Sequence, residues 1–202
     1  MSNGKGSASP SEMEPKDLPD VPAFQDEFTR DFLKSTEPVR EGFYPFEAKS
    51  EKFTMDFPGD MTIDERSYSK SSKNDSEFIT ISHTDENLDV ITNIQLKYYG
   101  FMGDEETSKE GMSAKMREKL NFESVSSEYE GQKIEIANYS SGPFPGFATL
   151  IWNDKDENIQ IFADMTCSEG LDSDECSKLV ESEKERILGV FQSIKLTQNE
   201  GE

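Results

Sequence analysis

Apolar and polar residues alternate through much of the chain after residue 43, and this period of two predicts β-strands. In KFTMDFPGD (52–60), Phe53, Met55 and Phe57 alternate with polar residues before Pro-Gly-Asp turns the chain. The longest run, at 88–100, places on one face Val90, Thr92, Ile94, Leu96 and Tyr98. Further strands are predicted at 77–84, 132–140, 146–153 and 158–166. The last two flank the acidic turn NDKDEN and form the clearest hairpin.

An early segment follows the helical period instead. Phe24, Phe28 and Phe32 recur every four residues and predict a short amphipathic helix over 24–35. Its aromatic face packs either on the rest of this chain or on a neighbouring molecule, and the pattern leaves both open.

Two later segments are also predicted to be helical. Met112, Met116 and Leu120 form a stripe four residues apart. In the last segment, 171–196, Asp172 and Glu175 have the spacing of an acidic capping box, and the face that follows is apolar except at Glu183.

The order of elements predicts one α+β domain over residues 43–197, with a largely antiparallel sheet and helices packed on its faces. Residues 23–42 form a short helical segment that packs on it. Residues 1–22 are rich in Ser, Pro, Gly, Glu and Asp, which predicts a disordered tether, and residues 198–202 form a solvated tail.

The charge of the chain excludes one class of partner. Acidic residues number 42 against 21 basic ones, and the net charge is −21. A nucleic-acid binder needs clustered Lys and Arg, so we expect no nucleic-acid partner. The acidity favours cations or a basic protein, although solubility alone also explains it. No apolar run approaches the roughly 18 residues that cross a bilayer.

Candidate catalytic chemistry is sparse. The single histidine, His83, stands at a predicted strand end and is expected to be solvated. With one His and two Cys, a zinc site of the usual kind is not expected. The acidic clusters at 103–106, 153–158 and 169–175 do not fit the spacing of an EF-hand. Asp154 and Asp156 are weak calcium candidates, and no cofactor and no metal are predicted.

The N-terminus and the cysteines point to an oxidising compartment. SNGKGSASPSE (2–12) is similar to the tether that follows the lipidated cysteine of bacterial lipoproteins, with Met1 in the place of that cysteine. An ordinary disordered terminus is the alternative. Cys167 and Cys176 flank a polar loop that is short enough to bring them within disulfide distance. Reduced, buried thiols are the alternative to that disulfide.

Two aromatic loops form a candidate patch for a partner or ligand. Tyr98, Tyr99 and Phe101 end the longest strand beside Gly100. Phe144 lies in the stiff loop SSGPFPG (140–146), where it is either an exposed anchor or a buried plug. We expect the patch wherever these two loops meet.

Residues 43–197 resemble the PsbP-like family. The opening strand in EKFTMDFPGDMTI and the closing helix in ERILGVFQSIKL are similar to the start and end of that family's domain. The resemblance implies an α/β/α sandwich around an antiparallel sheet. The family includes photosystem accessory proteins, a nuclear import factor that binds the Ran GTPase, and bacterial lipoproteins. Its members are mostly non-enzymatic, and it transfers no catalytic residue to this chain.

The first functional hypothesis is therefore a non-enzymatic lipoprotein of a Gram-positive bacterium, outside the cytoplasm and anchored to the outer face of the membrane only by an N-terminal lipid. It would bind an unknown protein or small ligand at the cell envelope. An intracellular acidic module that binds a basic protein is the second hypothesis, and a calcium-dependent hydrolase is the third.

Overall fold

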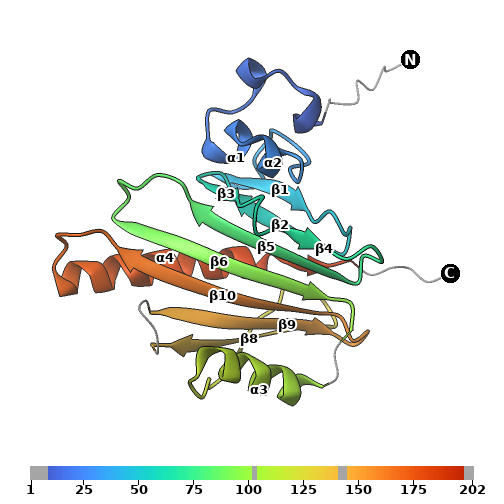
Figure 1. Ribbon diagram of the computed structural model, residues 1–202, viewed down its shortest axis with the longest axis vertical. Coiled ribbons are helices and arrows are strands. Elements are labelled where there is room, and N and C mark those ends of the chain that lie inside the picture. The colour runs from blue at the N-terminus through green and yellow to red at the C-terminus, as the bar shows by residue number, and fades with distance from the viewer. Residues whose placement is uncertain (1–8, 102–103, 141–144, 198–202) are drawn as a thin grey trace.

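The computed structural model describes residues 9–101, 104–140 and 145–197. It contains two antiparallel sheets and four α-helices, which confirms the α+β prediction (Figure 1). The strands of the larger sheet, in spatial order, are β3 (Met61–Ile63), β5 (Ser76–His83), β6 (Val90–Tyr99), β10 (Asn158–Cys167), β9 (Gly146–Asn153), β8 (Gln132–Tyr139) and β7 (Glu123–Val125), and β4 (Ser69–Lys70) also pairs with β5. The smaller sheet has the order β1 (Phe43–Glu47), β2 (Phe53–Pro58) and β11 (Lys195–Leu196).

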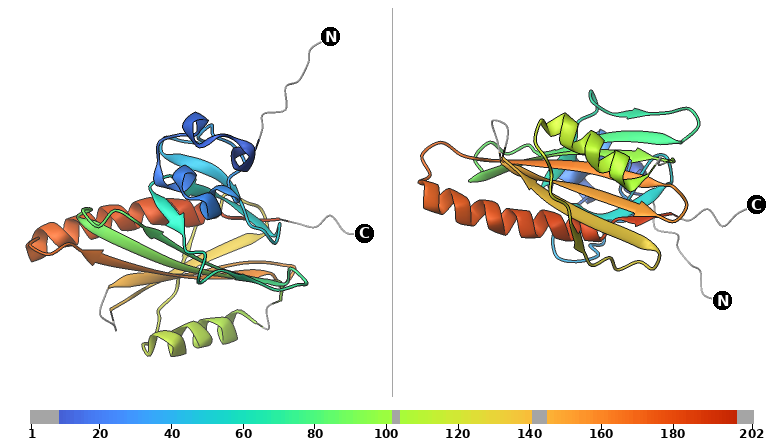
Figure 2. Two further views of the ribbon diagram at one scale, coloured as in Figure 1. Left: turned by 45° about the horizontal axis from the view of Figure 1, so that its top comes forward. Right: turned by 90° about the horizontal axis from the view of Figure 1, so that it is seen from below.

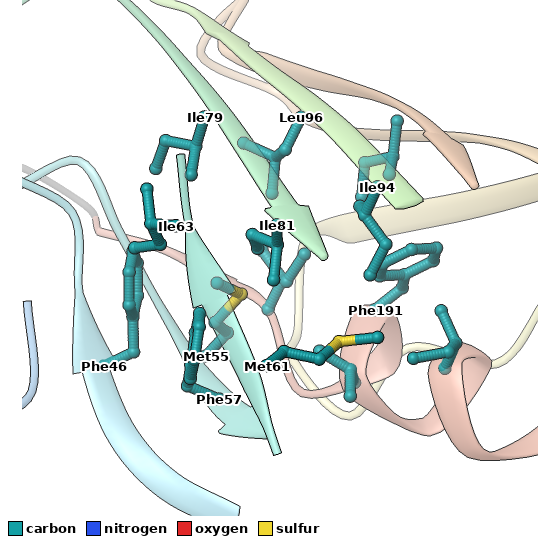
Figure 3. Close-up of a cluster of buried hydrophobic side chains, with 14 of the residues drawn as sticks. Phe46, Met55, Phe57, Met61, Ile63, Ile79, Ile81, Ile94, Leu96 and Phe191 are labelled. Atoms are coloured by element: carbon teal, nitrogen blue, oxygen red, sulfur yellow. The ribbon is translucent and has the colours of Figure 1, made fainter. Parts of the chain in front are cut away.

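The main core lies between the two sheets and α4 (Ser173–Gln192). Figure 3 shows Ile79 and Ile81 of β5 and Ile94 and Leu96 of β6 pointing toward Phe191 of α4 and the residues of the smaller sheet. All four are no more than 1% exposed, as the alternation predicts. We call this side of the larger sheet its inner face.

The opposite, outer face carries a smaller core under α3 (Glu105–Met116). Figures 1 and 2 show α3 lying over β8 and β9, on the side of the sheet away from α4. The buried members of this core are Met112, Leu120, Ala137, Tyr139, Ala148, Leu150, Trp152 and Phe162. The sheet is therefore covered along its inner face and over only part of its outer face.

The aromatic segment near the N-terminus packs on its own chain. Phe24 and Phe32 are completely buried, and Phe32 stacks on Phe46 with ring centroids 5.3 Å apart. The predicted single helix is wrong, because the segment forms two short helices, α1 (Pro22–Gln25) and α2 (Glu27–Arg30). Asp26 separates them: its backbone is extended, and its side chain caps α2 by accepting the N–H of Thr29.

The segment before α1 differs from the predicted tether over residues 1–22. Residues 10–12 and 15–17 form the 3₁₀ turns η1 (Pro10–Glu12) and η2 (Pro15–Asp17). Leu18 is 8% exposed and belongs to the main core, so residues 9–22 pack on the domain. Residues 1–8 and the predicted tail at 198–202 lie outside the described residues.

The Met112–Met116–Leu120 stripe is only partly helical. The helix α3 ends at Arg117, which has the left-handed φ of 55°. Leu120 lies beyond this end and is buried by the loop that folds back along the helix. In α4, Asp172 is the N-cap, as predicted, and accepts the N–H groups of Asp174 and Glu175.

Candidate functional site

The part of the outer face that α3 leaves uncovered is the candidate site. It is formed by β5, β6 and the adjoining edge of β10, which face the viewer in Figure 1. We call it the open half and define it by Phe78, Thr80, Asn93, Gln95, Lys97, Tyr99 and Gln160, all partly or fully exposed. It combines amide side chains with aromatic rings and a lysine.

Strand register arranges these side chains in rows across the sheet. One row runs from Phe78 through Lys97 to Gln160, because Lys97 pairs with both of the others. The neighbouring row pairs Gln95 with Phe162. The Nζ atom of Lys97 lies 5.3 Å from the centre of the Phe78 ring. The polar and aromatic groups therefore alternate at cross-strand distances of about 5 Å.

Lys115 of α3 extends into the open half at its border. Its Nζ donates to Oε1 of Gln95 at 3.0 Å and lies 3.8 Å above the centre of the Phe162 ring. Burial lowers the pKa of the Lys115 ammonium from its ordinary value, and the charge of Lys97 lowers it further. The positive charges of Lys97 and Lys115 are therefore close enough to repel each other.

Neither lysine forms a close ion pair in the described part of the chain, although the charge of Asp164 acts on Lys115 and by itself raises its pKa. No carboxylate oxygen there lies within 4.0 Å of the Nζ atom of Lys97 or Lys115. The nearby carboxylate of Asp164 accepts the hydroxyl of Tyr139 at 2.8 Å. By contrast, Nζ of Lys109, also on α3, lies 2.7 Å from a carboxylate oxygen of Glu135.

A small hollow of about 160 Å³ adjoins Lys97. Its lining consists of Ser69, Ser76, Glu77, Phe78, Lys97, Tyr98 and Tyr99. Two larger hollows, of about 720 and 600 Å³, lie along α3 and between β11 and the start of β8. The small hollow places hydroxyl groups, an ammonium, a buried carboxylate and aromatic rings around one point.

The predicted aromatic patch is present only in part. The rings of Tyr99 and Phe101 are 6.0 Å apart, and Phe101 is 65% exposed. Tyr98 does not belong to the patch, because it is 1% exposed on the inner face and its hydroxyl donates to Glu157. Adjacent strand residues point to opposite faces, so this separation follows from the alternation itself. Phe144 lies outside the described residues.

His83 is not the solvated strand-end residue that the sequence predicted. Its side chain is 3% exposed. Its Nδ1 atom accepts the backbone N–H of Thr92 at 3.1 Å, while Nε2 lies 3.3 Å from Oδ2 of Asp60 and 3.1 Å from a guanidinium nitrogen of Arg186. This geometry assigns the proton of the neutral ring to Nε2.

A group of polar side chains surrounds His83. Arg186 donates to both carboxylate oxygens of Glu183, at 2.7 and 2.8 Å, and to Asp60 at 3.2 Å. Glu183, the predicted polar interruption of the α4 face, also accepts the hydroxyl of the buried Thr92. Burial alone raises the pKa of the Asp60 carboxyl. The hydrogen bond from His83 and the charge of Arg186 outweigh it and hold that pKa below its ordinary value of 3.8.

Cys167 and Cys176 form a disulfide, which confirms the predicted pairing. It joins the end of β10 to the first turn of α4, and the Cα atoms are 5.9 Å apart. Next to the disulfide, Ser168 donates its N–H to the carbonyl oxygen of Asp89, the residue before β6.

The acidic clusters act in turns and helix caps. Asp154 and Asp156 lie exposed in the turn between β9 and β10, where Asp156 has the left-handed φ of 62°. Asp104 and Asp172 cap α3 and α4. Within the ranges 9–101, 104–140 and 145–197, no group of three or more His, Cys, Asp or Glu side chains is arranged to hold a metal ion.

Among the described helices, none is both long enough and apolar enough to cross a membrane.

Comparison with known proteins places the chain in a family. Residues 19–195 match the family described as "Putative lipoprotein YvcA". A Bacillus subtilis (strain 168) protein of the same name is 34% identical over 123 residues, which are 61% of this chain and 47% of that protein. The matched region thus spans about half the length of that curated relative. Because the family match extends over most of its length, the chain belongs to this YvcA family of lipoproteins.

Proposed function

We propose that the protein is a non-enzymatic binding module, tethered by an N-terminal lipid to the outer face of the cytoplasmic membrane of a Gram-positive bacterium. Membership of a lipoprotein family carries this proposal. In this proposal a lipidated cysteine near the N-terminus carries the anchor. The Ser- and Gly-rich residues that follow would then span the distance between the membrane and the packed residues from Pro10 onward.

The disulfide supports a location outside the cytoplasm. Disulfides persist in oxidising compartments and are rare where glutathione and thioredoxin keep thiols reduced. The bridge between Cys167 and Cys176 closes a short loop at the start of α4. In the reducing cytoplasm this bond would be kept reduced, so the disulfide weighs against an intracellular module.

The surroundings of His83 support a role in binding rather than catalysis. Both ring nitrogens face structural partners, and the side chain is almost completely buried. A general base needs a nitrogen that can reach the substrate. The open half, in contrast, presents side chains to solvent, and it is the surface that we assign to the partner.

The proposed relationship to the PsbP-like family agrees with this role. Helices lie on both faces of an antiparallel sheet, as the α/β/α sandwich of that family requires. Members of that family mostly bind or assemble other molecules. We therefore propose a shared fold with that family and no shared ligand.

Localisation tests the proposal directly. The protein is followed in its own cells by fractionation, by detergent phase separation and by adding protease to cells stripped of their wall. We expect it in the membrane fraction and in the detergent phase, and we expect added protease to remove it while a cytoplasmic marker survives. Mass spectrometry of the N-terminal peptide of the protein isolated from its own cells should show a lipidated cysteine.

The opposite pattern contradicts the proposal. A protein that stays in the aqueous phase, survives the added protease and carries two free thiols belongs in the cytoplasm. An unmodified N-terminal peptide would contradict the proposed lipid anchor, even if the protein proved to be outside the cell.

A further inference from the structure

We propose that the protein forms a dimer with twofold symmetry, in which the free edge of β7 pairs antiparallel with β7 of a second copy. The larger sheets of the two copies would then continue into each other across this pair of edge strands. The inference goes beyond the proposed function. It concerns the edge of the larger sheet and not the open half, and it does not depend on the lipid anchor.

The first argument is that the chain itself covers the other long sheet edges. Lys34 donates its N–H to the carbonyl oxygen of Pro45 and so covers β1. Beside β3, the N–H of Ile63 donates to the hydroxyl of Thr29 at 2.8 Å. Proteins usually cover or shorten their edge strands, because unpaired backbone groups attract the strands of other chains.

The edge of β11 is covered by a single amide side chain. Nε2 of Gln132 donates to the carbonyl oxygen of Ile194 at 2.7 Å, and Oε1 accepts the N–H of Leu196 at 3.1 Å. The amide thus binds the backbone on both sides of Lys195, as a neighbouring strand would. Gln132 is 8% exposed, so this edge is closed to another chain.

The edge of β7 has no such cover in the described part of the chain. Its backbone pairs with β8, and no other hydrogen bond to that backbone is found among the described residues. Glu123 and Ser124 are exposed, and Val125 is half-buried. β4 also has a single partner, but it is only two residues long. β7 is therefore the longer of the two edges that remain available to another chain.

The second argument is that β7 can pair with itself. In an antiparallel pair with twofold symmetry, the axis passes between two copies of the same residue. With Ser124 at the axis, Glu123 of each copy lies opposite Val125 of the other. Val125 packs against the main core, and the second copy would cover the side of it that is still exposed. The residues that meet at the axis are then small and uncharged, so no like charges face each other there.

The charges at the two ends of β7 are the third argument, because they select a second copy as the partner. Arg117 and Lys119 are exposed before β7, and Glu128 and Glu130 are exposed after it, while Glu118 is half-buried. Antiparallel pairing brings the residues before β7 in one copy to the residues after β7 in the other. Opposite charges therefore meet at both ends of the interface, whereas parallel pairing would bring like charges together.

The net charge of −21 opposes the association of two copies, but this repulsion is screened at a distance. The Debye length at physiological ionic strength is about 8 Å, so the charges at the contact decide. Two edges of three residues make a small interface, and small interfaces dissociate readily. We therefore expect a dimer that forms and separates as the protein concentration changes.

Sedimentation equilibrium of the chain over about 5–500 μM tests the inference. We expect the average mass to rise from that of one chain toward that of two. Lys119→Glu and Glu128→Lys should each raise the Kd of the dimer roughly tenfold, because the symmetry repeats each new like-charge contact. An equal mixture of the two variants should associate as well as the wild type, since the mixed dimer again joins opposite charges at both ends.

Lys178→Glu and Glu181→Lys are the matched controls. They change the net charge by the same amounts at exposed positions on α4. Each of them, and their mixture, should associate with the Kd of the wild type. Unfolding curves confirm that every variant is folded.

Cysteine cross-linking tests the register. Ser124→Cys places two thiols opposite each other at the axis, where cross-strand Cα atoms lie about 4.5–5.5 Å apart and a disulfide can form. Ser126→Cys is the matched control, because two residues from the axis on each strand put its copies about 13 Å apart. We expect mild oxidation to convert Ser124→Cys into a covalent dimer at least tenfold faster than Ser126→Cys.

Three outcomes overturn the inference. If the chain stays monomeric at every concentration, a second copy is not the partner of this edge, which then remains available to an extended segment of another protein. If the mixture associates no better than its two components, these charges do not meet. If both cysteine variants cross-link equally fast, Ser124 is not at the axis. None of these outcomes involves the lipid anchor, so the failure of this inference and the failure of the proposed function are distinguishable.

Discussion

The two faces of the larger sheet come from the same strands, yet they differ in almost every physical property. On the inner face, the apolar residues of β5 and β6 are at most 9% exposed and meet a second sheet and a long helix. On the outer face, the residues between them are polar or aromatic except for Ile91, and α3 covers only the far strands. The difference shows how alternation lets one strand stabilise the fold with one face and expose polar and aromatic side chains with the other.

The largest expected effect comes from truncating one phenylalanine of the main core and one of the open half, and comparing the two losses of stability. Phe46→Ala removes a ring that is 1% exposed and stacks on both Phe32 and Phe57, so we expect unfolding to become about 3–5 kcal/mol easier. Phe78→Ala, in the open half, should cost no more than about 1 kcal/mol. Urea unfolding measures both. Equal losses would mean that the open half is part of the core.

The next test concerns Arg186, which compensates acidic groups at the edge of the inner face. Arg186→Met leaves Glu183, whose side chain is 13% exposed, without its main partner, and we expect a loss of about 2–4 kcal/mol. Lys178→Met, on the same helix, is the matched control and should cost less than about 0.5 kcal/mol. A small loss for Arg186→Met would show that the group around His83 does not hold α4 on the sheet.

Removing the disulfide, which lies on the inner side of the sheet, should cause a loss of stability of intermediate size. Replacing Cys167 and Cys176 by serine opens a loop with a sequence separation of 9 residues, and we expect a loss of about 2–3 kcal/mol. Thermal unfolding of the wild type with reductant should match the double variant. Dimer formation through β7 should be unchanged. If it falls, α4 and the edge strand are coupled through the sheet.

The sequence predicts those parts of this arrangement whose interacting residues lie close together along the chain. The alternation around Ile79, Ile81 and Ile94 predicts their strands and their burial, because the signal lies within a few residues. The same alternation separates Tyr98 from Tyr99, although the predicted patch joined them. The helix at Phe24–Phe32 was expected to be continuous, but the side chain of Asp26 restarts it.

The surroundings of His83 are the clearest case that sequence reasoning misses. Its partners Asp60 and Arg186 lie far from it along the chain. The pairing of β3 with β5, in which Met61 lies opposite His83, brings Asp60 beside it, and the docking of α4 brings Arg186. The polar interruption at Glu183 in an otherwise apolar helical face was the one available signal. Leu18 was missed for a related reason, since a lone leucine in a polar segment carries no periodicity.

A pH-dependent prediction follows from Asp60. Its folded pKa lies below 3.8, so its carboxylate adds stability that is complete above the unfolded pKa and disappears as the pH falls through the folded pKa. We expect Asp60→Asn to lose about 1 kcal/mol at neutral pH, because the group is half exposed. The difference from the wild type should vanish in strong acid. A difference in stability that is independent of pH would show that Asp60 does not stabilise the protein through its charge.

The smallest expected effect on stability comes from a substitution in the open half. Lys97→Gln should change stability by less than about 0.5 kcal/mol, since Lys97 is exposed. It should nevertheless raise the pKa of Lys115 toward the ordinary value of 10.5, because it removes a neighbouring positive charge. An NMR titration of the Lys115 side chain measures this shift. Lys178→Gln should leave it unmoved, and an unchanged pKa in Lys97→Gln would contradict the crowding of the two ammonium groups.

The strand order of the smaller sheet has a consequence for how such a chain is made. Its central strand, β2, pairs with β1 a few residues earlier but also with β11, where Lys195 meets Thr54 and Leu196 meets Phe53. A polypeptide threaded through a membrane with its N-terminus first emerges as a hairpin whose aromatic side chains have no cover. That hairpin must wait for almost the whole chain to cross before the closing strand arrives. If the chain crosses a membrane as proposed, the sheet that β1 and β2 begin is therefore completed only after β11 has crossed.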